Sequence, residues 1–191
     1  MGGLGNYMFQ IAAAISLSID NKDNTEFYLR STTQVHKHIL KYSDNILRYV
    51  NIVDKNMVLY NIYDEPSFTY NEIPYHKDLL LKGYFQSEKY FKHNRQEIIS
   101  TFAPTTETIS QIQVKYGQIL SLDNTCSIHV RRGDYVKLSE HHPPCTMEYY
   151  NNAMSKMSKG VNYLIFSDDI EWCKKHFIGD EFTFIENEVD V

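Results

Sequence analysis

Long apolar runs are absent from this sequence of 191 residues. No stretch reaches the roughly 18 apolar residues that a helix needs to cross a membrane. The N-terminus also lacks the basic segment and the apolar core of a signal peptide. The sequence therefore predicts a cytoplasmic protein with no membrane segment.

Cysteine is scarce. Cys126, Cys145 and Cys173 form an odd count with no close pair, which predicts free thiols and disfavours both a disulfide framework and a zinc ribbon. The run His141-His142-Pro143-Pro144-Cys145 gathers metal-ligating residue types, but two prolines and one thiol do not assemble four ligands locally. We expect no metal site.

An excess of positive charge is missing as well. The net charge of −5 disfavours a nucleic-acid or anionic-membrane surface, because such surfaces carry basic patches. One small anionic ligand, bound by a local cluster of positive charge, is more consistent with this balance. Disorder is disfavoured too, since 15 tyrosines and 10 phenylalanines are typical of a globular chain that buries a core.

The chain is organised around residues 125–135. Thr125 to Val130 is a short β-branched run with turn-forming residues before and after it, which predicts a buried strand that ends at a tight turn. In open α/β sheets, ligands bind outside the carboxyl ends of the strands. We therefore expect residues 129–135 to form a functional rim, with His129 and Arg131 on one face if the strand geometry persists.

Two arginines stand at this rim. A planar guanidinium keeps its charge and presents a fork of donors that suits phosphate oxygens, so the pair favours a diphosphate ligand, with Arg131 as the better anion contact. An equally weighted alternative is that Arg131 and Arg132 pair with Asp134 and other acids to hold a turn. Arg132-Gly133-Asp134 also spells an adhesion tripeptide, but nothing in the sequence suggests secretion.

The second half of the chain alternates between strand and helix in a Rossmann-type order. The predicted elements are a strand at 125–130, a helix at 147–157, a strand at 162–166, a helix at 169–177 and a strand at 182–185. Ser167-Asp168-Asp169 then falls at the same rim as Arg131. Asp168 or Asp169 could accept hydrogen bonds from a ribose or a guanine, or could simply cap the following helix.

The first half opens on a glycine loop, Gly2-Gly3-Leu4-Gly5-Asn6, followed by an alanine-rich helix that should stop at residues 20–24. Asn6 is the expected N-cap, and the amides of Gly5 and Asn6 could bind an anion; the alternative is a simple turn before a core helix. The strand that normally precedes such a loop is missing. We also expect a short strand at 26–30, whereas residues 31–75 give no firm assignment and the apolar run at 79–81 leads into the segment that follows.

Gly83 to Phe91 alternates aromatic and hydrogen-bonding residues, which suits a sugar and equally suits an aromatic core segment. Two helices are expected at 94–102 and 105–120, separated by Pro104. They suggest a boundary between an N-terminal α/β domain, 1–120, and a partial Rossmann-like domain, 121–191.

Three segments together resemble glycosyltransferase family 11, the α-1,2-fucosyltransferases: GGLGNYMFQ at 2–10, GYFQSEKYF at 83–91 and HVRRGDY at 129–135. A fourth match is FSDDIEWC at 166–173, and His142, Cys145, Tyr149 and Tyr150 fall where the family has a short motif of its own. Two departures stand out. Tyr7 replaces the usual glutamine, and the family continues past Val191, so we expect a chain clipped at both ends.

The resemblance implies a GDP-fucose donor, a terminal β-galactose acceptor attacked through its 2-hydroxyl, and inversion at the fucose C1. It also implies a GT-B fold of two Rossmann-like domains, the C-terminal one incomplete, and no metal; family members with a membrane anchor reside in the Golgi. The expected donor-binding residues are Gly5, Asn6, His129, Arg131, Arg132, Ser167, Asp168 and Asp169.

In this interpretation Arg131 holds the β-phosphate, while His129 and Asp168 contact the nucleoside. Inversion also needs a base within reach of the attacking hydroxyl, and Asp134, Glu140 and His142 are the candidates. Two alternatives stay open: a catalytically incomplete fragment that binds a nucleotide sugar, and a fucosyltransferase of another linkage.

Overall fold

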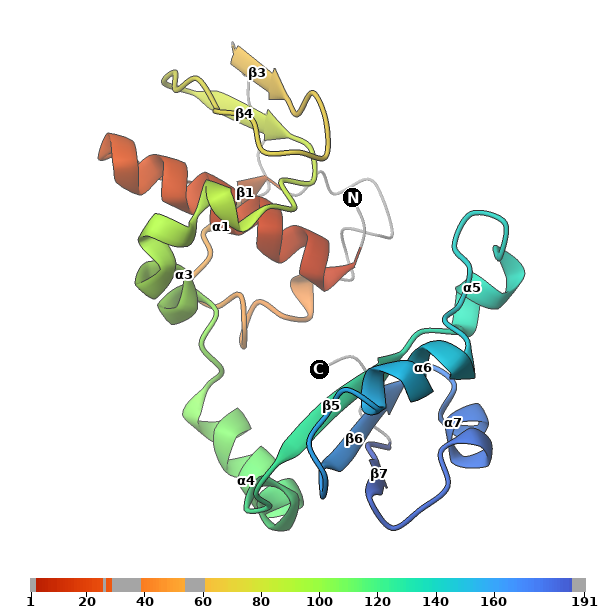
Figure 1. The fold of residues 1–191 in the computed structure, drawn as a ribbon. Coiled ribbons are helices and arrows are strands. Elements are labelled where there is room, and N and C mark those ends of the chain that lie inside the picture. Colours follow the sequence, from red (N-terminus) through yellow and green to blue (C-terminus); the bar gives the residue numbers. More distant parts are fainter. Residues whose placement is uncertain (1–2, 26, 29–38, 54–60, 187–191) are drawn as a thin grey trace. The chain divides into compact units, whose positions relative to one another are not determined.

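The computed structural model describes residues 3–25, 27–28, 39–53 and 61–186. The chain divides into two compact units, Met1–Ile109 and Ser110–Val191, and each is described here by itself. The division falls within helix α4 (Thr106–Leu120). The fold is mixed α/β, and the strand pairs within the described ranges are all parallel (Figure 1). None of the helices in these ranges is long and apolar enough to span a membrane.

The first unit is built on helix α1 (Leu4–Asn21), which buries Ile11, Ala12 and Ala13. The helix ends as predicted, at a left-handed Lys22. The predicted cap is wrong: Gly3 is the N-cap, and Asn6 lies inside the first turn, where its backbone N–H donates to the Gly3 carbonyl at 3.1 Å. The helix therefore starts three residues earlier than the side-chain preference of asparagine suggested.

Two short parallel pairs accompany α1. Strand β1 (Phe27–Tyr28) pairs with β2 (Ile52–Val53), and β3 (Asn61–Asp64) pairs with β4 (Leu79–Lys82). Strand β4 was not predicted from the sequence. Of the predicted strand at 26–30, residues 27–28 are confirmed and the rest lies outside the described residues.

Short helices complete this unit. They are the 3₁₀ turns η1 (Glu88–Tyr90) and η2 (Lys92–Asn94) and the helix α3 (Arg95–Thr101). The two helices predicted around Pro104 are confirmed as α3 and α4.

The segment 83–91 supplies part of the core of the first unit. Phe85 and Tyr90 are buried and meet edge to face at 5.4 Å, so for these two rings the core alternative is confirmed. Phe85 has a positive φ of 52°, and the consecutive amides of Tyr84 and Phe85 both donate to Oε2 of Glu65, at 2.7 and 2.9 Å. A methyl group on Gly83 would lie 2.4 Å from Cβ of Glu65, so this close approach requires glycine.

The second unit holds a three-stranded parallel sheet in the order β5 (Thr125–Val130), β6 (Asn162–Ser167) and β7 (Phe182–Phe184). Helix α6 (Met147–Met154) connects the first two strands, and α7 (Ile170–His176) connects the last two (Figure 1). The predicted strand–helix alternation is thus confirmed. The sequence did not predict the additional short helix α5 (Gly133–Lys137), which follows β5.

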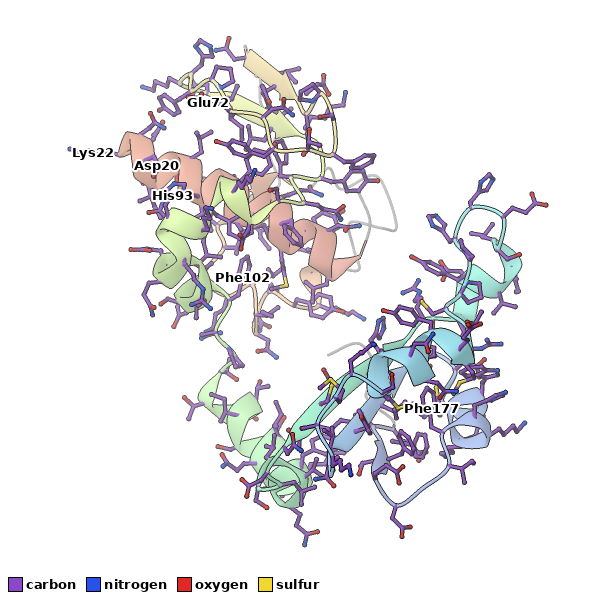
Figure 2. All side chains as sticks on the ribbon, in the orientation of Figure 1. Asp20, Lys22, Glu72, His93, Phe102 and Phe177 are labelled. Carbon is purple, nitrogen blue, oxygen red and sulfur yellow. The ribbon has the colours of Figure 1, made fainter. Side chains whose placement is uncertain are left out.

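One face of this sheet forms the core. Val130 and Ile165 are fully buried against residues of α6 and α7, and Phe177 packs edge-on against Tyr150 at 5.6 Å (Figure 2). On β5 burial alternates, so Thr125, Ser127 and His129 point to an exposed face. The expectation of a buried strand is therefore wrong for the exposed half of its side chains within this unit.

Candidate functional site

The carboxyl ends of β5 and β6 lie side by side, because Val130 pairs with Ser167 in the parallel register. The Ser167 hydroxyl donates to the Val130 carbonyl at 2.8 Å and accepts from the Asp169 backbone N–H at 2.9 Å. Residues 129–135 and 167–169 thus lie together at the carboxyl ends of the strands, as predicted. We call this group, residues 129–135 with 167–169, the rim.

Arg131 is held at the rim by two carboxylates. Its Nε and Nη2 donate to Oδ1 of Asp134 at 3.1 and 2.8 Å, and Nε lies 3.4 Å from Oδ2 of Asp168. These acids raise the pKa of Arg131, and the hydrogen bonds from Arg131 lower the pKa of Asp134. The Arg131 side chain is nevertheless 49% exposed, so a fixed positive charge faces solvent.

Arg132 has a different environment, since only 21% of its side chain is exposed. Its Nε donates to Oδ2 of Asp169 at 3.1 Å, and its guanidinium lies 4.1 Å from the centre of the Trp172 ring. Oδ1 of Asp169 accepts from the Trp172 backbone N–H at 3.2 Å and so caps α7. Arg132 therefore joins the end of β5 to the start of α7. Both arginines pair with acidic side chains, as the alternative interpretation of the sequence expected. Of the two, Arg131 also presents a half-exposed charge to solvent.

Asp168 stabilises the turn between β5 and α5. Its Oδ1 accepts from the Arg132 backbone N–H at 2.8 Å. A methyl group on Gly133 would lie only 2.7 Å from Oδ2 of Asp168. Glycine at position 133 therefore lets the carboxylate lie this close to the backbone. The carboxylate thus bridges the backbone of one strand end to the side chain of Arg131.

The remaining predicted catalytic residues lie after α5. His142 stacks on Tyr135 at 5.0 Å between ring centres, and the Arg131 guanidinium lies 5.2 Å from the centre of that same tyrosine ring. Glu140 is exposed in the turn that follows the helix, and its carboxylate forms no hydrogen bond or ion pair with the described residues. The structure therefore brings His142 near the rim through Tyr135 and leaves Glu140 on the surface.

The other predicted donor-binding residues are placed as follows. His129 is exposed on the open face of the sheet, paired in register with Phe166. Gly5 and Asn6 belong to the first unit, in the opening turn of α1 rather than in a loop. Oδ1 of Asn6 accepts from Nε2 of Gln86 at 2.7 Å, which joins two of the sequence segments singled out above.

Sequence reasoning gave no individual role to Trp172, Glu65 or Gln86, although Gln86 and Trp172 fall within the segments quoted above. Trp172 lies three residues after the cap Asp169, which is about one helical turn. A side chain that pairs with Asp169, as Arg132 does, is therefore also within reach of Trp172. Glu65 and Gln86 act across 20 and 80 residues of sequence, and no local pattern marks such partners.

The thiols and potential metal ligands are dispersed. Within the described ranges no three His, Cys, Asp or Glu side chains gather as a metal site, and Cys126, Cys145 and Cys173 are free. Burial raises the pKa of the Cys173 thiol, and burial together with Cys145 raises the pKa of Tyr150 to about 12.

Comparison with known proteins identifies the family. The model of Glycosyl transferase family 11 matches residues 1–186. An alpha-1,2-colitosyltransferase of Escherichia coli is 26% identical over 100% of this chain and 77% of its own length. A galactoside 2-alpha-L-fucosyltransferase of Caenorhabditis elegans is 26% identical over 99% of this chain, which spans 52% of that relative.

A third relative, the O-antigen biosynthesis glycosyltransferase WbnK of Escherichia coli, is 26% identical over 97% of this chain and 76% of its own length. No solved structure matches the chain. Since the family model covers nearly all of the sequence, the chain belongs to glycosyltransferase family 11.

Proposed function

We propose that this glycosyltransferase moves fucose from GDP-fucose to the 2-hydroxyl of a terminal β-galactose, with inversion at the fucose C1. Family membership supports a nucleotide-sugar donor and a glycan acceptor, and one relative is a galactoside 2-alpha-L-fucosyltransferase. The observation that carries the proposal is the half-exposed guanidinium of Arg131 at the carboxyl ends of β5 and β6. Parallel sheets bind anionic ligands at this edge.

In the proposed reaction the galactose 2-oxygen attacks C1 of fucose while the bond from C1 to the β-phosphate oxygen breaks. GDP leaves with the bonding electron pair, and the proton of the attacking hydroxyl passes to a base. The departing diphosphate needs charge neutralisation, and a fixed guanidinium aimed at it supplies this without a metal ion. Arg131 performs that role, and His129, Ser167 and Asp168 contact the nucleoside.

The base is proposed to be one of Asp134, Glu140 and His142, which follow the rim along the chain. A GT-B arrangement is also part of the proposal. Its support is that the chain forms two compact units and that each unit contains parallel strands.

A second candidate donor is a colitose nucleotide. The observation that favours it is the match over the whole chain to an alpha-1,2-colitosyltransferase. The two proposals differ in the sugar that is moved and agree on the linkage.

The test is a transfer assay with the full chain, GDP-fucose and lactose as the β-galactoside, with a chelator present throughout. Transfer with an α-1,2 product by NMR, lost in Arg131→Ala, is the expected result. Transfer from GDP-colitose but not from GDP-fucose would establish the second candidate. GDP binding without any transfer would indicate a nucleotide-sugar-binding fragment, and another linkage in the product would overturn the regiochemistry.

A further inference from the structure

We infer that Asp134 and Asp168 are positioning residues, which hold one edge of the Arg131 guanidinium so that its other edge is presented to the donor diphosphate. The inference rests on the proposed function, because it refines how the proposed donor site works. It also assigns Asp134 a role other than that of the general base, and Asp168 a role other than direct contact with the nucleoside.

The geometry of the guanidinium carries the first step. An arginine has a side edge, made of Nε and one terminal nitrogen, and an end edge made of both terminal nitrogens. Oδ1 of Asp134 accepts from Nε and Nη2 of Arg131, and Oδ2 of Asp168 lies 3.4 Å from the same Nε. The two carboxylates therefore fill the side edge. The end edge still has donors, and the side chain is 49% exposed.

Asp168 is itself fixed by the backbone, which carries the second step. Its Oδ1 accepts from the Arg132 N–H at 2.8 Å, and its Oδ2 rests against Gly133. Hydrogen bonding from Ser167 to the Val130 carbonyl ties the end of its own strand to β5. The carboxylate is therefore held in place by main-chain contacts from the turn that also carries Arg131.

The position of two acids beside an anion site needs a physical reason. Each negative charge repels a diphosphate, so as simple neighbours they would weaken donor binding. Their benefit is preorganisation: a free arginine loses side-chain entropy when it binds, whereas a guanidinium already locked on one edge loses less. The two effects have opposite signs, and this makes the inference testable.

The same contacts argue against Asp134 as the base. One of its oxygens is shared by two donors of Arg131, and these bonds, with the charge of Arg131, hold the pKa of Asp134 below its ordinary value. A carboxylate that binds protons weakly is an inefficient general base. Glu140 and His142 then remain as candidates for that step.

The first measurement is a calorimetric titration of GDP into the parent chain and into Asp134→Asn, Asp168→Asn and the control Asp180→Asn. Asparagine keeps the size of the side chain and an oxygen that can accept a hydrogen bond. Asp180 is exposed and lies in the same unit, so its variant removes one negative charge away from the rim. We expect GDP affinity to fall about tenfold in both rim variants and to stay unchanged in the control.

Tighter GDP binding in the rim variants would show that the acids act only as repelling neighbours, and would overturn the inference. Unchanged affinity in Asp134→Asn combined with lost turnover would identify Asp134 as the base, and would overturn it as well. If Asp168→Asn does not fold by circular dichroism, Asp134→Asn decides, because 55% of the Asp134 side chain is exposed and its loss is easily tolerated.

A second measurement separates this inference from the proposed function. The Nε–H signal of Arg131 in a ¹H–¹⁵N spectrum of the ligand-free chain is assigned by its loss in Arg131→Lys. We expect the signal to shift and to exchange faster in Asp134→Asn and Asp168→Asn, but not in Asp180→Asn. An unmoved signal overturns the positioning role whatever the affinity for GDP. If the signal moves in the two rim variants but the parent chain does not bind GDP, the positioning role stands and the proposed donor site is refuted instead.

Discussion

Nε2 of His93 lies 2.8 Å from Oδ2 of Asp20 and 3.3 Å from the buried hydroxyl of Ser16 (Figure 2). Nδ2 of Asn94 donates to the other Asp20 oxygen at 2.8 Å and to the Ser16 hydroxyl at 3.0 Å. These bonds tie the last turns of α1 to η2 and the start of α3. The first unit therefore depends on a polar contact between segments that are more than 70 residues apart in sequence.

We predict that Asp20 stabilises the fold above about pH 4 and ceases to do so in acid. Burial raises the pKa of Asp20, but hydrogen bonds from His93 and Asn94 outweigh it, so the folded-state pKa is lower than the ordinary value. The unfolded chain then binds more protons in this range, and the contribution of Asp20 is lost as pH falls through its folded-state pKa.

The measurement is the free energy of unfolding of the parent chain and of Asp20→Asn between pH 2 and pH 7. The parent should be more stable near neutral pH, and the difference should shrink toward pH 2. A difference that stays constant over the whole range would contradict the prediction.

Gly83→Ala should destabilise the chain by about 1 to 3 kcal/mol. The new methyl group would meet Cβ of Glu65 at 2.4 Å, and Glu65 cannot withdraw without releasing the amides of Tyr84 and Phe85. The matched control is Gly117→Ala in the last turn of α4, where nothing lies within 4 Å of the added carbon. Helix propensity predicts that this control is stabilised by about 0.5 to 1 kcal/mol. Thermal and urea unfolding of both variants would decide, and equal effects would refute the steric argument.

Much of the second unit could be predicted from the sequence, because its pattern is local. Short apolar runs alternate with helical spacing, and turn residues mark each strand end, so the common edge of Arg131 and Ser167 follows from the parallel order alone. The same reasoning left either Asp168 or Asp169 as an alternative helix cap, and the structure shows Asp169 in that role.

The errors have a physical cause as well. Asn6 has the side chain of an N-cap, but glycine at position 3 can also start a helix, and propensity does not choose between them. Strand 125–130 was predicted to be buried because its composition is β-branched, whereas only one face is covered within its unit. The contacts of Glu65 and Gln86 depend on tertiary structure, which a single sequence does not encode as a local pattern.

Ile165→Ala should cost about 2 to 5 kcal/mol of unfolding free energy. Ile165 is fully buried at the centre of β6, between the partner strands and the helices on the covered face, so truncation leaves a cavity. The control is Ile62→Ala on β3, because that side chain is 59% exposed and its truncation leaves no cavity. Urea unfolding should separate the two variants clearly, and a loss of similar size in both would argue against the core described here.

The last prediction separates the two arginines. Arg131→Ala should reduce GDP affinity by tenfold or more with little change in stability, since its side chain is half exposed and its partners can be solvated. Arg132→Ala should instead lower the free energy of unfolding by about 1 to 3 kcal/mol, because it removes a hydrogen bond to Asp169 and the stacking on Trp172.

Lysine substitutions sharpen the contrast between these positions. Arg132→Lys keeps the charge but loses the planar group that stacks on Trp172, so most of the stability loss should remain. Arg131→Lys keeps a charge at the rim but loses the fork, so GDP binding should recover only in part. Thermal unfolding and GDP titration of all four variants provide the measurement. A stability loss at Arg131 together with an affinity loss confined to Arg132 would reverse the assignment, and would make Arg132 the residue that contacts the diphosphate.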